Sequence, residues 1–273
     1  MVSDPAAGPA GPRITADLGH GGRWTSLVAH GRDWLWHRTD PARAGVRPGD
    51  AFADAGGLEE CVPTVRGAPD HGDAWSRPWR PDGPGAYVEC PDFRLDRRIG
   101  TGDAETVVDY RLSARAGYRF VWAAHALLDL SEEAHIEIAP GTPLRLYPDE
   151  GPAWSAGRWP LAGGVPLDRL GPSDGTALGA VIETPEATVH DGADRLTLRI
   201  EADGAPVAVA LWRNLGGFPR EAPYRSVGVE PMLGRVFDRE GAEDGDTACV
   251  PGTGELRWRL TVTALRRGDG ASP

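Results

Sequence analysis

The hydrophobic pattern of this chain repeats every two residues over much of its length. In the clearest segment, 255–265, one set of alternate positions is apolar and the other holds arginine or threonine at 257, 259, 261 and 263. The apolar positions are Leu256, Trp258, Leu260, Val262 and Ala264. Successive side chains of a β-strand point to opposite faces of a sheet, so this pattern predicts a strand with one buried face. No long stretch shows a convincing apolar stripe of helical period, and the pattern therefore favours an all-β protein.

Further short apolar segments, separated by turn residues, are also predicted to be strands. Two lie within 14–37 around glycine-rich turns, and the segments 106–115, 118–130 and 134–141 follow in succession. The segment 194–214 holds two alternating runs on either side of Asp203-Gly204, which predicts a β-hairpin.

Glycine and proline punctuate the whole chain evenly. The sequence has 37 glycines and 25 prolines, and no shift in composition marks a linker. All-β sandwiches of 273 residues are common as single units, so we expect one large antiparallel sandwich domain over 13–266. The ends, 1–12 and 267–273, are polar or rich in small residues and are expected to be loose.

The charge balance narrows the classes of partner. Twenty-nine basic and 40 acidic residues give a net charge of −11, and the two signs are interspersed. Nucleic acid and anionic membrane surfaces are therefore not expected partners. No apolar run is long enough to span a membrane, and the first residues have no signal-peptide pattern, so we expect a cytoplasmic protein. Cys61, Cys90 and Cys249 are widely spaced, which favours reduced thiols over disulfides or a zinc site.

The chain contains no lysine. Schiff-base mechanisms, pyridoxal enzymes and Walker A phosphate loops all require a lysine, so these classes are excluded. No dinucleotide-binding glycine-rich turn opens a helix either. We expect a protein that needs no cofactor.

The segment PDHGDAWSRPW, 69–79, combines a histidine with two tryptophans between prolines. Its prolines and glycine restrict the backbone, so the segment is predicted to form a fixed loop that presents His71. A purely structural interpretation is equally open, in which Trp75 and Trp79 close the end of the core and His71 is a satisfied polar neighbour.

Three other segments contain candidate site residues. His125 lies in an apolar strand beside Trp122, where a histidine is more often a satisfied core residue than a catalyst. Glu230 ends an apolar run immediately before Pro231, so its carboxylate is expected at a strand terminus. Asp174 lies in a Gly/Pro/Ser turn, where aspartate usually caps the backbone.

Together these segments resemble the aldose 1-epimerases, also called galactose mutarotases. The segments that carry the resemblance are GGRWTSLVAHGRDWLW, GGLEECVPTV, DHGDAWSRPW, FVWAAH and GVEP, and it extends from about Ile14 to about Leu265. The resemblance implies a large antiparallel β-supersandwich with very little helix, and cofactor-free interconversion of the α and β anomers of free aldoses. It matches His71 and His125 to the two active-site histidines and Glu230 to the catalytic glutamate. Asp174 matches the substrate-binding aspartate by order and context only.

Anomerisation needs one base for the C1 hydroxyl proton and one acid for the ring oxygen. In the implied mechanism Glu230 is the base, His125 is the acid, and His71 hydrogen-bonds the ring oxygen or a neighbouring hydroxyl. Trp75, Trp79 and Trp122 are candidate stacking surfaces for a sugar, and Arg77 is a candidate ligand of a hydroxyl or an anionic group. Core or surface roles are open for these four.

The sequence also departs from the family pattern. The Asn-Arg pair that precedes the first histidine in better-known mutarotases is missing from 56–70, and Met232 stands where a glutamine is usual. These departures indicate a divergent subgroup with an unknown sugar. Three alternatives are open: a carbohydrate-binding or regulatory module without catalysis, the same acid and base acting on a sugar phosphate, a sulfonated sugar or a biosynthetic intermediate, and a metal site. The sequence leaves the oligomeric state open.

Overall fold

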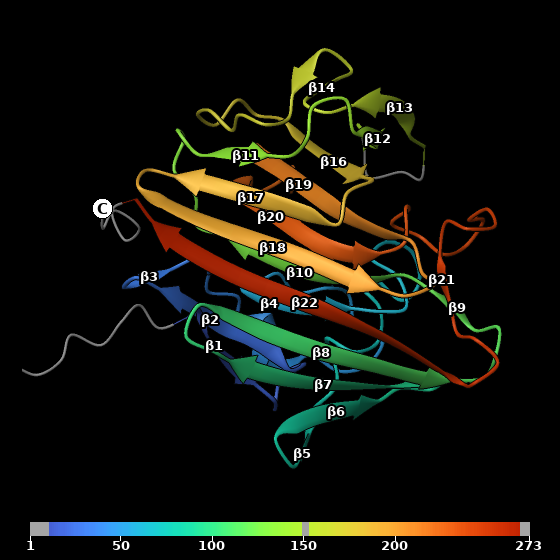
Figure 1. Ribbon diagram of the computed structural model, residues 1–273. Coiled ribbons are helices and arrows are strands. Elements are labelled where there is room, and N and C mark those ends of the chain that lie inside the picture. Colours follow the sequence, from blue (N-terminus) through green and yellow to red (C-terminus); the bar gives the residue numbers. More distant parts are fainter. Residues whose placement is uncertain (1–10, 149–152, 268–273) are drawn as a thin grey trace, which may run out of the picture.

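Two large antiparallel β-sheets face each other in this protein (Figure 1). The computed structural model describes residues 11–148 and 153–267. Within them the only helical element is a 3₁₀ helix, η1 (Pro41–Gly45). The predicted all-β supersandwich is therefore confirmed.

The larger sheet has twelve strands. In spatial order they are β1 (Arg13–Asp17), β2 (Arg23–Ala29), β4 (Leu58–Cys61), β10 (Trp122–Leu128), β20 (Tyr224–Leu233), β19 (Val207–Phe218), β16 (Ala177–Ile182), β12 (Pro143–Tyr147), β13 (Ser155–Arg158), β14 (Leu161–Ala162) and β15 (Val165–Pro166), with β3 (Arg32–Asp33) beside β2.

The second sheet has eight strands. They are β11 (His135–Glu137), β17 (Glu186–Asp191), β18 (Asp194–Ala202), β22 (Glu255–Arg266), β8 (Glu105–Ala114), β7 (Phe93–Thr101), β6 (Gly85–Glu89) and β5 (Arg80–Asp82). A separate two-stranded ribbon joins β9 (Arg119–Phe120) to β21 (Ala248–Cys249).

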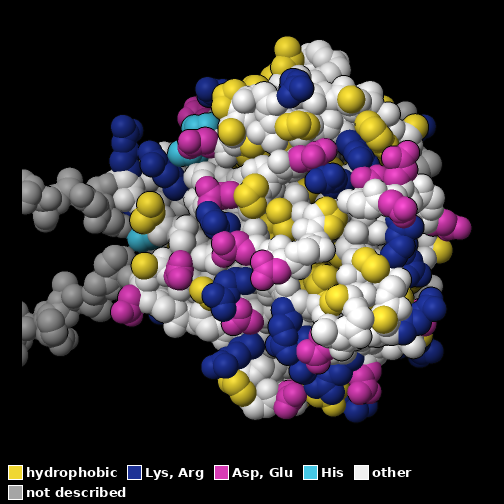
Figure 2. All heavy atoms as spheres, turned by 45° about the vertical axis from the view of Figure 1, so that its right-hand side comes forward, with side chains coloured by type: hydrophobic (Ala, Val, Ile, Leu, Met, Phe, Trp, Pro, Cys, Tyr) yellow, Lys and Arg dark blue, Asp and Glu magenta, His cyan; other side chains and the backbone are white. Residues whose placement is uncertain are grey.

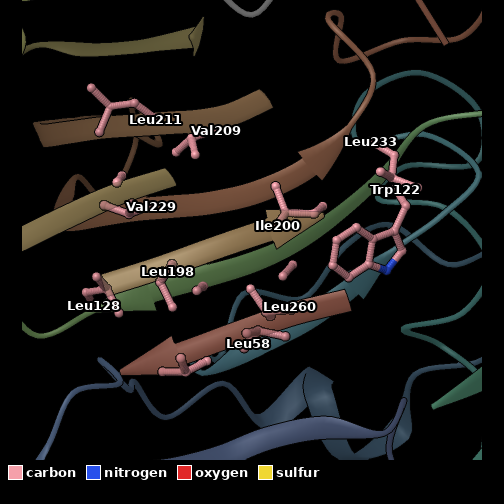
Figure 3. Packing of buried hydrophobic residues seen from close by; sticks show 14 of the residues in the cluster. Leu58, Trp122, Leu128, Leu198, Ile200, Val209, Leu211, Val229, Leu233 and Leu260 are labelled. Carbon is pink, nitrogen blue, oxygen red and sulfur yellow. The ribbon is translucent and has the colours of Figure 1, made fainter. Parts of the chain in front are cut away.

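The alternation of β22 is borne out in full. Its five apolar positions are buried, whereas the arginines between them, Arg257 and Arg259, are exposed. Apolar side chains from both sheets meet between them in one core (Figure 3). Leu198, Ile200 and Leu260 come from the eight-stranded sheet and pack toward Leu58 and Val229 of the other.

The predicted hairpin over 194–214 is wrong. Its two halves are indeed strands, but β18 pairs with β17 and β22 in one sheet, and β19 pairs with β16 and β20 in the other. The turn at Asp203-Gly204 carries the chain from one layer to the next. Local alternation and turn residues are the same for a hairpin and for such a crossing, so the sequence could not separate the two.

Parts of the predicted loose ends are fastened to the sheets. The amide of Gly11 donates to the carbonyl of Gly102, and the hydroxyl of Thr106 donates to the carbonyl of Pro12. At the other end the amide of Arg267 donates to the carbonyl of Ala193. The remainder of these predictions, 1–10 and 268–273, lies outside the described residues.

A second, smaller apolar cluster lies on the face of the twelve-stranded sheet that points away from the sandwich core. It contains Cys61, Ala123, Ala210 and Met232, together with Phe237 from the loop after β20. Because this face is also covered, every residue of β10 is buried. The candidate site is built on this same face.

Candidate active site

Three neighbouring strands place ionisable side chains in one row. Glu59 of β4 is the register partner of His125 of β10. On the other side of β10, the pairs Ala123 with Met232 and Leu127 with Gly228 put Glu230 of β20 opposite His125. The expected strand terminus at Glu230 is wrong, because β20 continues through Pro231 to Leu233. Residues paired across antiparallel strands point to the same face, so the three side chains lie side by side.

His125 and Glu230 form a buried ion pair. Nδ1 of His125 lies 2.9 Å from Oε1 of Glu230, and their side chains are only 10% and 3% exposed. Burial disfavours the charge on His125, but the carboxylates of Glu230, Asp54 and Glu59 outweigh burial and raise the pKa of His125 to about 9. His125 is therefore an imidazolium at neutral pH.

The second oxygen of Glu230 is free. Oε2 is buried and accepts no hydrogen bond from any described residue. A buried carboxylate oxygen without a donor is costly, and a bound ligand or a catalytic role is one explanation for such an atom. Glu230 therefore holds His125 with one oxygen and has the other available for a ligand.

His71 is held on a loop that begins after β4. The segment 69–79 contains no strand, as predicted, and His71 has a φ of 56°, in the left-handed region that few non-glycine residues adopt. Nδ1 of His71 lies 2.8 Å from Oδ1 of Asp70, and the ring of Phe52 stacks on the imidazole at 3.6 Å between centroids. Backbone and ring are thus both fixed.

The two histidines face each other. Their ring centroids are 5.1 Å apart and their planes are inclined by 72°. Burial lowers the pKa of His71, and the positive charge of His125 acts in the same direction, against the opposing effect of Asp70 and Glu230. The site therefore pairs a cationic imidazole with a neutral one.

These residues line a cavity of about 610 Å³. His71, His125 and Glu230, the three predicted catalytic residues, all lie on its wall. The wall is otherwise partly aromatic and partly charged. Its aromatic residues are Phe52, Trp212, Phe218, Tyr224 and Phe237, and its other charged residues are Arg38, Asp40, Asp54, Arg66 and Asp70.

A buried arginine joins the site to its supporting loop. Nε and Nη2 of Arg43, from η1, donate to the two oxygens of Glu59 at 2.9 and 3.0 Å. Nη2 also donates to the carbonyl of Trp75, which lies in the loop of His71. Burial raises the pKa of Glu59 to about 7 even though Arg43 opposes it. This pair fixes the loop against the sheet that carries His125.

The predicted sugar-binding residues lie elsewhere. Trp75, Trp79 and Trp122 are buried, and their indole N–H groups donate to Asp70, Ala74 and Glu60 respectively. Arg77 pairs with Asp73. Asp174 caps its own turn by accepting from Thr176, and it pairs with Arg213. None of the five is among the lining residues of the cavity.

Sequence reasoning missed the aromatic wall and the acidic partners. Trp212 lies on β19 and Tyr224 lies on β20. The sequence of a strand does not show which of its two faces lines a cavity. Phe52 lies 19 positions before His71 in a segment without a motif. Of these residues only Asp70 could have been predicted from the sequence, because a carboxylate next to a histidine can accept a hydrogen bond from its ring.

Among the residues that the structure describes, no group of three or more His, Cys, Asp and Glu side chains is arranged to hold a metal ion. No helix there is long and apolar enough to cross a membrane. On the surface, arginine and acidic side chains are interspersed over most of the face seen in Figure 2.

Solved structures show which fold this is. A provisionally assigned aldose 1-epimerase from Escherichia coli K12 superposes with a TM-score of 0.70 at 14% identity, covering 93% of this chain and 96% of that one. A galactose 1-epimerase from Lactobacillus acidophilus NCFM gives 0.63 at 13%, covering 96% and 93%. The Slr1438 protein from Synechocystis sp. PCC 6803 gives 0.66 at 14%, covering 97% and 100%.

No protein-family profile and no curated protein sequence matches the chain. The structural matches show that the chain has the galactose mutarotase-like fold. At identities of 13–14% they establish the fold alone.

Proposed function

We propose that this protein is an aldose 1-epimerase that interconverts sugar anomers by ring opening and closure. The observation that carries the proposal is the pair of Glu230 and His125, in which one carboxylate oxygen holds the imidazolium and the other has no partner. The reaction requires a base and an acid at the same sugar. Both are present on one cavity wall.

In the forward direction Glu230 Oε2 takes the proton of the C1 hydroxyl, and the C1–O5 bond breaks as C1 becomes an aldehyde. His125 delivers a proton from Nε2 to the ring oxygen, because its Nδ1 faces Oε1 of Glu230 at 2.9 Å. Rotation about the C1–C2 bond then presents the other aldehyde face, and the same groups act in reverse. The raised pKa of His125 keeps the acid charged at neutral pH.

The cavity wall supports a sugar as the ligand. Aromatic side chains offer apolar faces against which a pyranose can stack, and carboxylates and guanidinium groups can bind its hydroxyls. Trp212 and Tyr224 now replace the three buried tryptophans as candidate stacking residues, and Arg38 and Asp40 replace Arg77 and Asp174 as candidate polar ligands.

The test is the Glu230→Gln variant with freshly dissolved α-D-glucose and α-D-galactose, followed by polarimetry or NMR. Glutamine keeps the size of the side chain but cannot accept the proton, so anomer interconversion should slow by roughly 10²–10⁴-fold. Binding of the sugar, measured by NMR line broadening, should survive. Equal rates for wild type and variant would refute the mechanism.

A second candidate is a carbohydrate-binding module that uses the same cavity. A binding module requires no base, so this function does not explain why Oε2 of Glu230 has no hydrogen-bond partner. A wild-type protein that binds one of these sugars and accelerates neither anomerisation would favour it. The same assay with phosphorylated and sulfonated sugars tests whether the acid and base serve a modified substrate.

A further inference from the structure

The two histidines of the cavity are held in opposite ways, although each has a carboxylate at Nδ1. His125 is paired with buried Glu230, and Asp54 and Glu59 add to the negative charge around it. His71 is paired with Asp70, whose side chain is 48% exposed, and it faces the positive charge of His125. The first arrangement stabilises a cation, and the second leaves the ring neutral.

A neutral imidazole carries one proton, and its neighbours decide which nitrogen holds it. The carboxylate of Asp70 can only accept, so Nδ1 of His71 must carry the hydrogen that bridges their 2.8 Å separation. Nε2 is then a lone-pair acceptor. On His125, in contrast, both nitrogens carry hydrogens, because the ring is charged.

Three contacts hold Asp70 and His71 in this geometry. The second oxygen of Asp70 accepts from the backbone amide of Phe52, and the indole of Trp75 donates to the carbonyl of Asp70. The ring of Phe52 lies parallel to the imidazole, with an interplanar angle of 8°. Asp70 and the imidazole therefore have little freedom to turn.

Resting on the proposed function, we propose that Asp70 is a specificity-determining positioning residue that makes His71 an obligate hydrogen-bond acceptor for one hydroxyl group of the sugar. His71 then does not protonate the ring oxygen, and that task belongs to His125 alone. The ligand is an aldose that presents a hydroxyl donor to Nε2 of His71. A deoxy sugar at that position covers this partly buried acceptor without pairing it and is rejected.

The charged and titratable groups around His71 agree with this assignment. Asp70 lies on its own loop, His125 on β10 and Glu230 on β20, and Phe52 covers one face of the ring. Burial and His125 together lower the pKa of His71. At neutral pH the ring is therefore uncharged even beside Asp70.

The direct test is nitrogen NMR of the protein with ¹⁵N-labelled histidine at pH 7.5. The chain has seven histidines, and the signals of His71 and His125 are identified by their loss in the His71→Asn and His125→Asn variants. We expect a protonated Nδ1 and an unprotonated Nε2 for His71, and two protonated nitrogens for His125. A protonated Nε2 on His71 in the wild type overturns the proposal. The spectrum needs no substrate, so it decides the proposal even if anomerisation is not the function.

The Asp70→Asn variant should reverse the tautomer. The asparagine oxygen is expected to keep the bond from the Phe52 amide, so its NH₂ group faces Nδ1 of His71 and donates to it. The hydrogen then moves to Nε2. The matched control is Asp73→Asn, because Asp73 lies in the same loop but pairs with Arg77. It should leave the His71 signals unchanged, and a His71 tautomer that is the same in all three proteins contradicts the proposal.

Kinetics give an independent measure. The monodeoxy derivatives of whichever aldose the wild type accepts, D-glucose or D-galactose, are compared by kcat/KM. One of them should be disfavoured by about 5- to 100-fold in the wild type, the range for an unpaired buried acceptor. Asp70→Asn should reduce this discrimination, whereas Asp73→Asn should retain it. Discrimination that is equal in wild type and Asp70→Asn overturns the proposal.

Discussion

Gly228 leaves the space that the carboxylate of Glu230 occupies: a Cβ atom at position 228 would lie 2.3 Å from Oε1 of Glu230. The two residues are two positions apart on β20 and therefore share a face of the sheet. Oε1 is also the atom that contacts His125. A glycine at 228 is thus a requirement of the ion pair.

We therefore expect the Gly228→Ala variant to fold and to lose activity. The nearest clash falls on the far end of the Glu230 side chain, which can turn away, and the Cβ of Trp212 lies 3.1 Å from the added atom. The protein should therefore still fold, but breaking the buried Glu230–His125 contact should also lower the free energy of unfolding. Anomerisation should fall by at least about tenfold, and the fall should be in kcat. Gly252→Ala is the control, since a Cβ there meets no atom within 4 Å. Full activity of Gly228→Ala would show that the pair is dispensable.

The titration of His125 is a second prediction. Its pKa of about 9 depends on Glu230 more than on any other neighbour. NMR of the wild type should give a midpoint near pH 9, and anomerisation should decline as pH rises through this value, because the acid loses its proton. Glu230→Gln should move the midpoint downward. An unchanged midpoint would contradict the assignment of Glu230 as the partner.

The raised pKa of His125 gives a third prediction, which concerns the free energy of unfolding. The pKa of His125 is raised above the 6.5 of a free histidine, so its contribution is fully present below pH 6.5 and is lost as pH rises through about 9. The free energy of unfolding should therefore fall across this interval, and urea denaturation at several pH values measures the slope. His125→Asn should remove this part of the pH dependence.

A buried ion pair inside the sandwich core gives a fourth prediction. Nη1 of Arg97 lies 2.8 Å from Oε1 of Glu60, and both side chains are at most 2% exposed. Arg97→Met leaves the carboxylate of Glu60 buried without its cation and should cost about 3–5 kcal/mol of unfolding free energy. Arg259→Met breaks a half-exposed pair with Asp109 and should cost less than about 1 kcal/mol. Urea denaturation distinguishes them, and equal costs would contradict this account.

The aromatic wall of the cavity gives a fifth prediction. Trp212 lines the cavity, and its indole donates to the hydroxyl of Ser226, which fixes the ring. Trp212→Leu should raise KM by about 2- to 12-fold, the worth of an aromatic contact, with little change in kcat. Trp154→Leu removes a more exposed indole that does not line this cavity and should leave KM unchanged. A KM that responds to Trp154 and not to Trp212 would place the sugar elsewhere.

The sequence did not reveal which aromatic residues line the cavity, because the cavity is formed by segments that lie far apart in the chain. Trp75, Trp79 and Trp122 were candidates for sugar contact because they stand near the two histidines in the sequence, yet all three are buried. A tryptophan in a loop gives the same local pattern whether its ring faces a cavity or the core. Phe52 and Trp212 reach the cavity from segments that no motif marks.

The sequence by itself determined several of the strands, the near absence of helix and the identity of three lining residues, His71, His125 and Glu230. Alternation is a local property, since each side chain's face follows from its neighbours along one strand. Only the tertiary structure decided which sheet each strand joined, as the separation of β18 from β19 demonstrates. It also placed Glu59, His125 and Glu230 in one row, because register between strands depends on hydrogen bonds between segments far apart in the chain.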